Sequence, residues 1–447
     1  MSLQPADLAR LLVAVTLLLV FAHAAGRLFA ILRQPPVIGE ILGGLLLGPT
    51  VLGLLAPQAQ ERLFPPDGPV AVGIGVLTQF GLLLLMFLAG REVPAFRGAG
   101  RNRAVVAMAV AGLAIPFAVG LGAVRLVDHT AFSGPNGSPT TFALVFGIGI
   151  AVTSIPVISR IMIDLDIMRT HFARIVLSVA LLEDIVLYVA LAAVLGMAQA
   201  GSGAEFGLAA LFDGGAGQSS AYHFAASFLF FAVFMLLGRP IFDRLSHSRF
   251  NFIERRSATA FRLIFLLALV LVCVFLGVNP IFGAVLAGVA SAAADSRDTD
   301  EEHRLETERA WDALKKVSLA LFIPLYFAGV GLQLDLVHHF SVWFFFAFLL
   351  LACLVKSASV WLGARLAGES KRASVDFAVA LNARGGPGIV LATVTLSAGV
   401  INEDFFTILV VLSIVTSQIA GSWLQHAFRA EPATTPAGGR HADVKTT

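Results

Sequence analysis

Long blocks of apolar residues recur along the whole chain and limit what it can fold into. A helix of about 20 apolar residues crosses the hydrocarbon core of a bilayer. Only 13% of the 447 residues are charged, against about 25% in soluble domains, which is too few for the surface of a soluble globule. We therefore predict an all-α polytopic membrane protein, embedded in a lipid bilayer, with about 13 transmembrane helices. The blocks are residues 8–31, 36–56, 70–90, 104–126, 142–163, 174–199, 223–242, 258–277, 279–294, 317–334, 341–366, 375–400 and 404–428.

The distribution of arginine and lysine supports this count and predicts an orientation. When the loops between blocks are assigned alternately to the two membrane faces, most of the 31 basic residues fall on one face. The exceptions are Arg10, Arg62 and Arg125 on the other face, and Lys356 and Arg384 within blocks. Because positively charged loops remain in the cytoplasm, we predict an outer N-terminus and a cytoplasmic C-terminus, in the inner membrane of the cell.

The order of the blocks predicts two halves of opposite orientation. Residues 8–199 form a first repeat and residues 258–428 a second, each with six blocks. The odd block between them, residues 223–242, is a linker helix that inverts the second half. Inverted repeats are found in secondary transporters, whose sites lie between the repeats. Residues 1–428 thus form one transmembrane domain, and we expect residues 429–447, rich in small and polar residues, to be a disordered cytoplasmic tail.

Glu183 and Asp184 are adjacent carboxylates in the middle of an apolar block. Ionisable groups at membrane depth are costly and indicate a functional site. Two neighbouring carboxylates there cannot both ionise unless a cation lies close by, and carboxylate oxygens suit hard cations such as sodium. We predict that both residues bind a proton or a cation in exchange. The only metal expected at Asp184 is the transported monovalent cation, and we expect no cofactor.

Lys356 lies in the middle of another apolar block, too deep for its ammonium group to reach the interface. A buried ammonium needs a carboxylate, so we predict that Lys356 pairs with Glu183 or Asp184, the two acids available at that depth. Arg384, also within a block, is expected to compensate charge. If an entering cation displaces the proton of Asp184 and breaks this pair, Lys356 releases a second proton. The sequence favours that case, in which transport moves net charge; if the pair stays closed, one proton exchanges for one cation.

Two blocks contain residues that interrupt a helix. Proline removes a backbone donor and disfavours helical geometry in the residue before it. Broken helices at membrane depth line cavities, and their ends can hold ions. We predict breaks at Pro156 in one block and at Gly385, Gly386 and Pro387 in the other, with Thr153 and Ser154 contributing to the cation and proton site.

Taken together, these motifs resemble those of the monovalent cation:proton antiporter family, in its second subfamily. The resemblance covers residues 8–428 and implies a scaffold domain beside a six-helix core with two broken helices that cross near the site. It also implies that Asp184 is the essential cation- and proton-binding aspartate and that Lys356 pairs with the preceding acid, Glu183, when little cation is bound. Glu183 departs from the Asp, Asn or Gln found there in relatives. The motifs stand at Pro36–Pro49, Thr153–Pro156, Glu183–Asp184, Pro324–Leu332, Lys356 and Asn382–Gly385.

The predicted function is secondary active antiport of a monovalent cation, Na⁺ or K⁺, against protons by alternating access. Two alternatives remain open. One is a carrier of an organic or anionic solute on the same fold, which would have no use for the acidic pair. The other is a membrane sensor without transport, which would be expected to have lost Asp184 or Lys356. We expect no enzymatic activity, because no set of catalytic residues is visible, and no nucleic-acid partner; a homodimer is the expected assembly.

Overall fold

The computed structural model describes most of the chain, and most of that part is helical. Residues 430–447, which make up nearly all of the predicted tail, lie outside the described residues, as does Pro156. The described residues are 4–32, 34–92, 103–154, 158, 161–162, 165, 167, 170–199, 208, 216–248, 251–295 and 301–429.

Each of the thirteen apolar blocks contains a helix in its described part. Eleven helical stretches of the described chain are long and apolar enough to cross a membrane. Two further apolar helices, α6 (Pro139–Ala151) and α12 (Pro280–Asp295), are shorter. The prediction of an all-helical polytopic membrane protein is therefore confirmed, whereas the number of about 13 spans stays a prediction.

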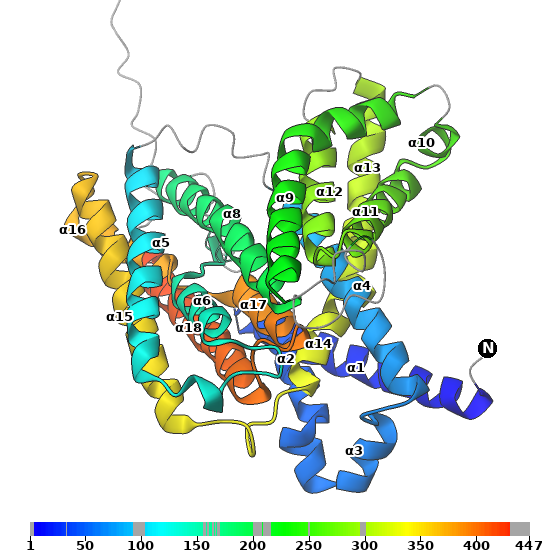
Figure 1. Cartoon of the computed structure of the whole chain (residues 1–447), viewed down its shortest axis with the longest axis horizontal. Helices are drawn as coiled ribbons and strands as arrows, with labels where there is room; N and C mark the ends of the chain where they lie inside the picture. Colours follow the sequence, from blue (N-terminus) through cyan, green and yellow to red (C-terminus); the bar gives the residue numbers. More distant parts are fainter. Residues whose placement is uncertain are drawn as a thin grey trace, which may run out of the picture.

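The helices pack as two bundles, which Figure 1 shows on opposite sides of the molecule. The panel bundle contains α1 (Pro5–Ile31), α2 (Pro36–Leu47), α3 (Pro57–Leu63), α4 (Pro69–Glu92), α9 (Ala216–Ser246), α10 (Phe252–Arg256), α11 (Ala258–Phe275), α12, α13 (Glu301–Val317) and α14 (Ile323–Leu332). The core bundle contains α5 (Arg103–Ala123), α6, α8 (His171–Gln199), α15 (Val342–Leu366), α16 (Lys371–Ala380), α17 (Gly385–Ser397) and α18 (Glu403–Arg429). Each bundle draws helices from both predicted repeats, and α8 packs against α9 where the bundles meet.

Glycines bring helix backbones into direct contact within the panel bundle. A β-carbon at Gly44 in α2 would lie 1.9 Å from the carbonyl oxygen of Ala328 in α14. A β-carbon at Gly331 in α14 would lie 1.9 Å from the carbonyl oxygen of Ile41 in α2. Small residues at such positions allow the close van der Waals packing that holds helices together in lipid. The glycine-rich motif at Pro36–Pro49 thus packs helices in the panel bundle.

A cluster of charged and aromatic side chains attaches α13 to the rest of the panel bundle. The buried guanidinium group of Arg262 lies 2.8 Å from Asp295 and 3.3 Å from Glu254. The indole N–H of Trp311 in α13 donates to the other oxygen of Asp295 at 2.7 Å. Arg91 lies over the Trp311 ring, 4.7 Å from its centroid. These contacts satisfy the polar groups that α13 buries.

Hydrogen bonds at one end of the core bundle join the loop between α5 and α6 to the loop between α17 and α18. The main-chain N–H of Asn136 donates to the carbonyl of Gly399 at 2.8 Å. The side-chain amide of Asn402 donates to the carbonyl of Ala131, also at 2.8 Å. We call this contact the loop clasp. Because one loop leads into α6 and the other leaves α17, the clasp holds these two short helices together.

His339, in the loop between α14 and α15, contacts two carboxylates at the start of α18. Its Nδ1 lies 2.8 Å from Asp404 and its Nε2 lies 3.1 Å from Glu403. Burial alone would lower the pKa of His339, but the hydrogen bond to Asp404 and the charges of Glu403, Asp404 and Asp335 outweigh it. The pKa of His339 is therefore raised above its ordinary value.

We expect the stabilisation by His339 to depend on pH. A histidine whose folded-state pKa is raised contributes fully below its unfolded pKa of about 6.5 and loses that contribution as pH rises through the folded value. His339→Ala should therefore lower the melting temperature more at about pH 5.5 than at about pH 9. His23→Ala is the control, because His23 contacts a main-chain carbonyl, that of Ala320, rather than a carboxylate, so its effect on the melting temperature should be similar at both pH values. An equal loss at both pH values for His339→Ala would contradict the expectation.

Candidate ion-binding site

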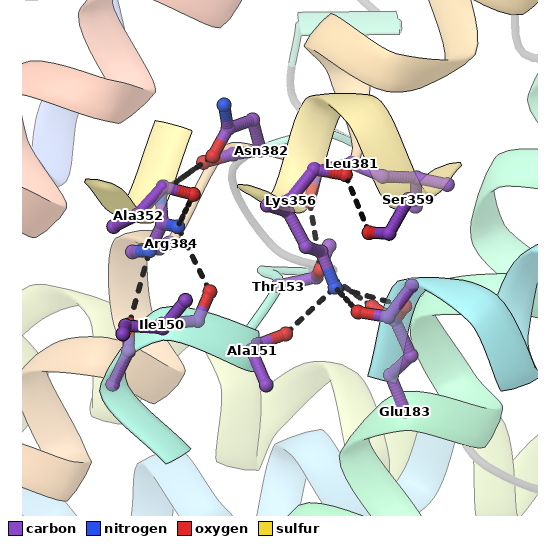
Figure 2. Close-up of polar contacts among 12 residues, drawn as sticks. Ile150, Ala151, Thr153, Glu183, Ala352, Lys356, Ser359, Leu381, Asn382 and Arg384 are labelled. Carbon is purple, nitrogen blue, oxygen red and sulfur yellow. Dashed lines mark hydrogen bonds and ion pairs between the residues drawn. The ribbon is translucent and has the colours of Figure 1, made fainter. Parts of the chain in front are cut away.

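The candidate site lies in the core bundle, where two interruptions of helix meet. The helix α6 ends just before residues 152–154, and residues 381–384 separate α16 from α17. The hydroxyl oxygen of Thr153 lies 2.8 Å from the carbonyl oxygen of Leu381, so the two interruptions are in direct contact. Figure 2 shows the charged side chains of α8 and α15 pointing into this junction.

The end of α6 leaves carbonyl groups that no helical N–H satisfies, which is the general condition of a helix C-terminus. Here two cationic side chains bind them. Arg384 donates to the carbonyls of Gly149 at 3.1 Å and Ile150 at 2.9 Å. Lys356 donates to the carbonyl of Ala151 at 2.6 Å (Figure 2). Positive charge is favoured at this end because the helix dipole is negative there.

Every N–H group of Arg384 is occupied by a neutral oxygen. Besides the two carbonyls of α6, the guanidinium donates to the main-chain carbonyl of Asn382 at 3.0 Å and to its side-chain oxygen at 2.6 Å. The last donor binds the carbonyl of Ala352 in α15 at 3.0 Å. A guanidinium has five N–H donors, so this fully buried side chain has none left for a ligand.

Lys356 makes the predicted contact with Glu183. Its Nζ lies 2.9 Å from Glu183 Oε1, and both side chains are buried. The same Nζ donates to the carbonyl of Gly112 in α5 at 2.7 Å and to that of Ala151. An ammonium group has three N–H donors, and these three acceptors, on α8, α5 and α6, take all of them.

Thr153 completes the contacts of Glu183. Its hydroxyl lies 2.5 Å from Glu183 Oε2, in addition to the carbonyl of Leu381. A hydroxyl has one proton and can accept as well as donate. It therefore donates to Glu183 when that carboxylate is ionised, and to Leu381 when the carboxyl group is protonated and donates to it. Both oxygens of Glu183 are thus engaged.

Asp184 differs from its neighbour because one of its carboxylate oxygens is unpaired among the described residues. Its Oδ1 is buried and has no hydrogen-bond partner among the described residues, and the same holds for the hydroxyl of Ser154. Buried polar atoms in proteins almost always have a partner, so each exception needs an explanation. For Asp184, a bound proton or cation would be such an explanation.

The structure brings most of the predicted site residues together but corrects the position of the second break. Gly386 and Pro387 were expected to lie in an unwound segment, yet they lie in the first turn of α17. Gly385, the first residue of α17, has a φ of +32°, which is not helical, so the prediction of a break holds at this residue. The unwound residues are 381–384. Proline is tolerated in the first turn because the N–H that it lacks would have no helical partner there. Pro156, the other predicted break, lies outside the described residues.

Sequence reasoning missed two residues that shape the site. Gly112 supplies a carbonyl to Lys356, and Asn382 binds Arg384 with both of its oxygens. Asn382 belongs to a motif that was recognised, but nothing in its residue type indicated this contact. Gly112 contacts Lys356 through its main-chain carbonyl, a group that every residue has. The residue type at position 112 therefore did not indicate this contact.

A buried charged site at the junction of two interrupted helices, inside a helical membrane bundle, is characteristic of secondary transporters. The chain belongs to the sodium/hydrogen exchanger family: the model of its transmembrane domain matches residues 14–430. This confirms the resemblance seen in the sequence.

Several antiporters are similar to this chain along most of its length. The Na⁺/H⁺ antiporter NhaS4 of Synechocystis sp. is 28% identical over 407 residues, which are 89% of this chain and 92% of NhaS4. The K⁺/H⁺ antiporter 1 of Saccharomyces cerevisiae is 28% identical over 87% of this chain, but the match spans only 43% of that longer protein. The solved structure of the sodium proton antiporter MjNhaP1 from Methanocaldococcus jannaschii has the same fold, with a TM-score of 0.64, 15% identity and coverage of 95% of this chain and 99% of that one.

We expect the stabilities of Glu183 and Lys356 variants to be strongly coupled. Lys356→Ala leaves a buried carboxylate without its counter-ion, which typically costs about 3–5 kcal/mol. The double variant Glu183→Ala/Lys356→Ala removes both charges and should melt at a higher temperature than Lys356→Ala alone. Thermal unfolding of the purified proteins in detergent measures this.

The exposed pair Asp312 and Lys316 on α13, with 2.6 Å between its charged atoms, is the matched control. Exposed pairs contribute little because water and salt screen them, so its double-variant cycle should show little coupling. If the double variant lost as much melting temperature as the two single variants together, the interaction between Glu183 and Lys356 would be weaker than predicted.

Proposed function

We propose that the protein is a secondary active antiporter that exchanges a monovalent cation, Na⁺ or K⁺, for protons by alternating access. The observation that carries the proposal is the buried Asp184, whose Oδ1 has no hydrogen-bond partner among the described residues and which follows Glu183, the carboxylate paired with Lys356, in the sequence. One carboxylate that can hold either a proton or a cation, but not both, is sufficient for coupled exchange. Membership of the sodium/hydrogen exchanger family supports it, as do the names of the sodium and potassium antiporters that the chain resembles.

Alternating access would move one bundle against the other. The residues of the candidate site come from α5, α6, α8, α15 and the segment between α16 and α17, all in the core bundle. A displacement of the core bundle along the panel bundle would expose Asp184 first to one side of the membrane and then to the other without dismantling the site. Ser154 and Thr153, at the interruption after α6, would provide further oxygens to the bound ion.

The contacts of Arg384 argue against the alternative of an anion carrier. An anion site needs a positive group with free N–H donors, and all five donors of Arg384 bind neutral oxygens of the protein. The donors of Lys356 are likewise occupied. A sensor without transport would not need an open carboxylate beside a closed ion pair. The proposal also includes an inner-membrane location, an outer N-terminus, a cytoplasmic C-terminus and a homodimer.

We expect Asp184→Asn to abolish exchange while the protein still folds. Asparagine has the shape of aspartate but neither ionises nor offers a negative charge to a cation. Purified protein in liposomes that contain a pH-sensitive dye should respond to added Na⁺, K⁺ or Li⁺, and Asp184→Asn should give the response of protein-free liposomes. Size-exclusion chromatography and the melting temperature check folding.

Asp67→Asn is the matched control, because Asp67 is exposed in a loop and its substitution should leave the rate unchanged. Exchange by Asp184→Asn at the wild-type rate would show that another group binds the ion and the proton.

A further inference from the structure

We propose that the loop of residues 333–341 is a strap that slows exchange when His339 is protonated, because the charged imidazole then fastens the panel bundle to the core bundle. This inference rests on the proposed antiport function and adds a form of regulation to it. The strap joins α14, in the panel bundle, to α15, in the core bundle, and Figure 1 shows it crossing from one bundle to the other. Because alternating access would move one bundle along the other, this short connection must follow the motion.

Thr50 fixes the beginning of the strap to the panel bundle. Its hydroxyl donates to the carbonyl of Leu334 at 2.6 Å and accepts from the main-chain N–H of Leu336 at 3.0 Å. A hydroxyl can donate and accept at the same time, so both contacts are satisfied together. Thr50 lies in the short helical segment Pro49–Gly53 that follows α2, and α2 packs against α1 and α14. The first part of the strap therefore stays with the panel bundle.

His339 fixes the end of the strap to the core bundle. Its two ring nitrogens lie 2.8 Å from Asp404 and 3.1 Å from Glu403, the first two residues of α18. The residue just before them, Asn402, takes part in the loop clasp. The imidazole thus contacts α18 at the place where the loop clasp already ties the core bundle together.

The two anchors leave little free chain between the bundles. Only Val337 and His338 lie between the last residue that Thr50 holds and His339. A chain spans at most about 3.6 Å per residue, so the fastened strap permits only a short displacement of one bundle along the other. If His339 is released, further residues up to Val342, where α15 begins, can extend. The permitted displacement then grows.

Fastening depends on the charge of the imidazole. Both ring nitrogens carry a proton only in the charged form, whereas the neutral form has one N–H. Loss of the charge therefore leaves one carboxylate of α18 facing a lone pair. Among the described residues, the charged groups that face His339 are all carboxylates, namely Glu403 and Asp404 on α18 and Asp335 in the strap itself. The neighbouring His338 contacts Asp335.

These carboxylates widen the pH range in which the strap is fastened. Burial alone would lower the pKa of His339, but the hydrogen bond to Asp404 and the nearby negative charges raise it above its ordinary value of about 6.5. The strap is therefore fastened below this raised value and released as pH rises through it. Because His339 lies at the membrane face that we expect to be outer, the pH that matters is the one outside.

The test compares the pH dependence of exchange by the wild type and by His339→Gln in liposomes that contain a pH-sensitive dye. Initial rates after a jump in Na⁺ or K⁺ are measured with the same starting pH on both sides. Protons compete with the cation for Asp184 in both proteins, so the ratio of the two rates removes this effect. At about pH 6 the wild type should be about two- to fivefold slower than His339→Gln, the effect expected of partly exposed ion pairs. At about pH 8.5 the two rates should agree, because both imidazole and amide are then neutral.

Thr50→Val separates a strap from a direct effect of His339 on the ion. Valine has the shape of threonine but cannot bind Leu334 and Leu336, while His339 keeps its carboxylates. With the panel anchor gone, the contact with α18 no longer joins the bundles, so Thr50→Val should lose the slow rate at the lower pH. His129→Gln is the matched control, because His129 lies in the loop between α5 and α6, at the same end of the core bundle. It should keep the wild-type pH dependence.

The outcomes distinguish the strap from the antiport function. Slowing at the lower pH that disappears in both His339→Gln and Thr50→Val supports the strap. The same pH dependence in the wild type and His339→Gln overturns the strap, and so does slowing that persists in Thr50→Val; both results leave the antiport function standing. Should one variant not fold, the other decides. No proton movement by the wild type with any monovalent cation overturns the antiport function and, with it, this regulation.

Discussion

The rest of the site depends on the carbonyl groups that α6 leaves unsatisfied where it ends inside the core bundle. In a membrane interior no water reaches such groups, so the protein must supply their donors itself. Arg384 and Lys356 do so, and each brings a positive charge to a place where charge is costly. Lys356 in turn requires the carboxylate of Glu183. Asp184, the next residue along α8, then lies beside a pair whose own charges are already balanced.

The contacts separate three charged groups that the protein itself neutralises from one, Asp184, that is proposed to bind the exchanged ion. Arg384, Lys356 and Glu183 are tied to main-chain carbonyls or to Thr153, and they hold the two interrupted helices together. Asp184 has an oxygen that no described group binds. In the proposed exchange, the contacts of the three paired groups do not involve the ion, so they can persist when the ion leaves Asp184.

Much of this could be predicted from the sequence, for physical reasons that differ from residue to residue. The helices followed from the length of the apolar blocks, since a membrane permits few other backbone structures. That Lys356 contacts Glu183 or Asp184 followed from the cost of burying its charge alone, and the choice of Glu183 followed from the family resemblance. The break predicted at Gly386 and Pro387 was misplaced, because a Gly-Gly-Pro segment can begin a helix as well as interrupt one. The carbonyl of Gly112 could not be anticipated, since main-chain oxygens are the same in every residue and only the fold shows which one faces an ammonium group.

The backbone contact between α2 and α14 has a mechanical consequence. Where Gly44 and Gly331 each meet the backbone of the opposite helix, no side chain separates the two helices. Their packing at these positions therefore cannot change by a change of rotamer. The distance between α2 and α14 is therefore set by the backbones themselves, and in the proposed motion of the core bundle this part of the panel bundle would keep its spacing.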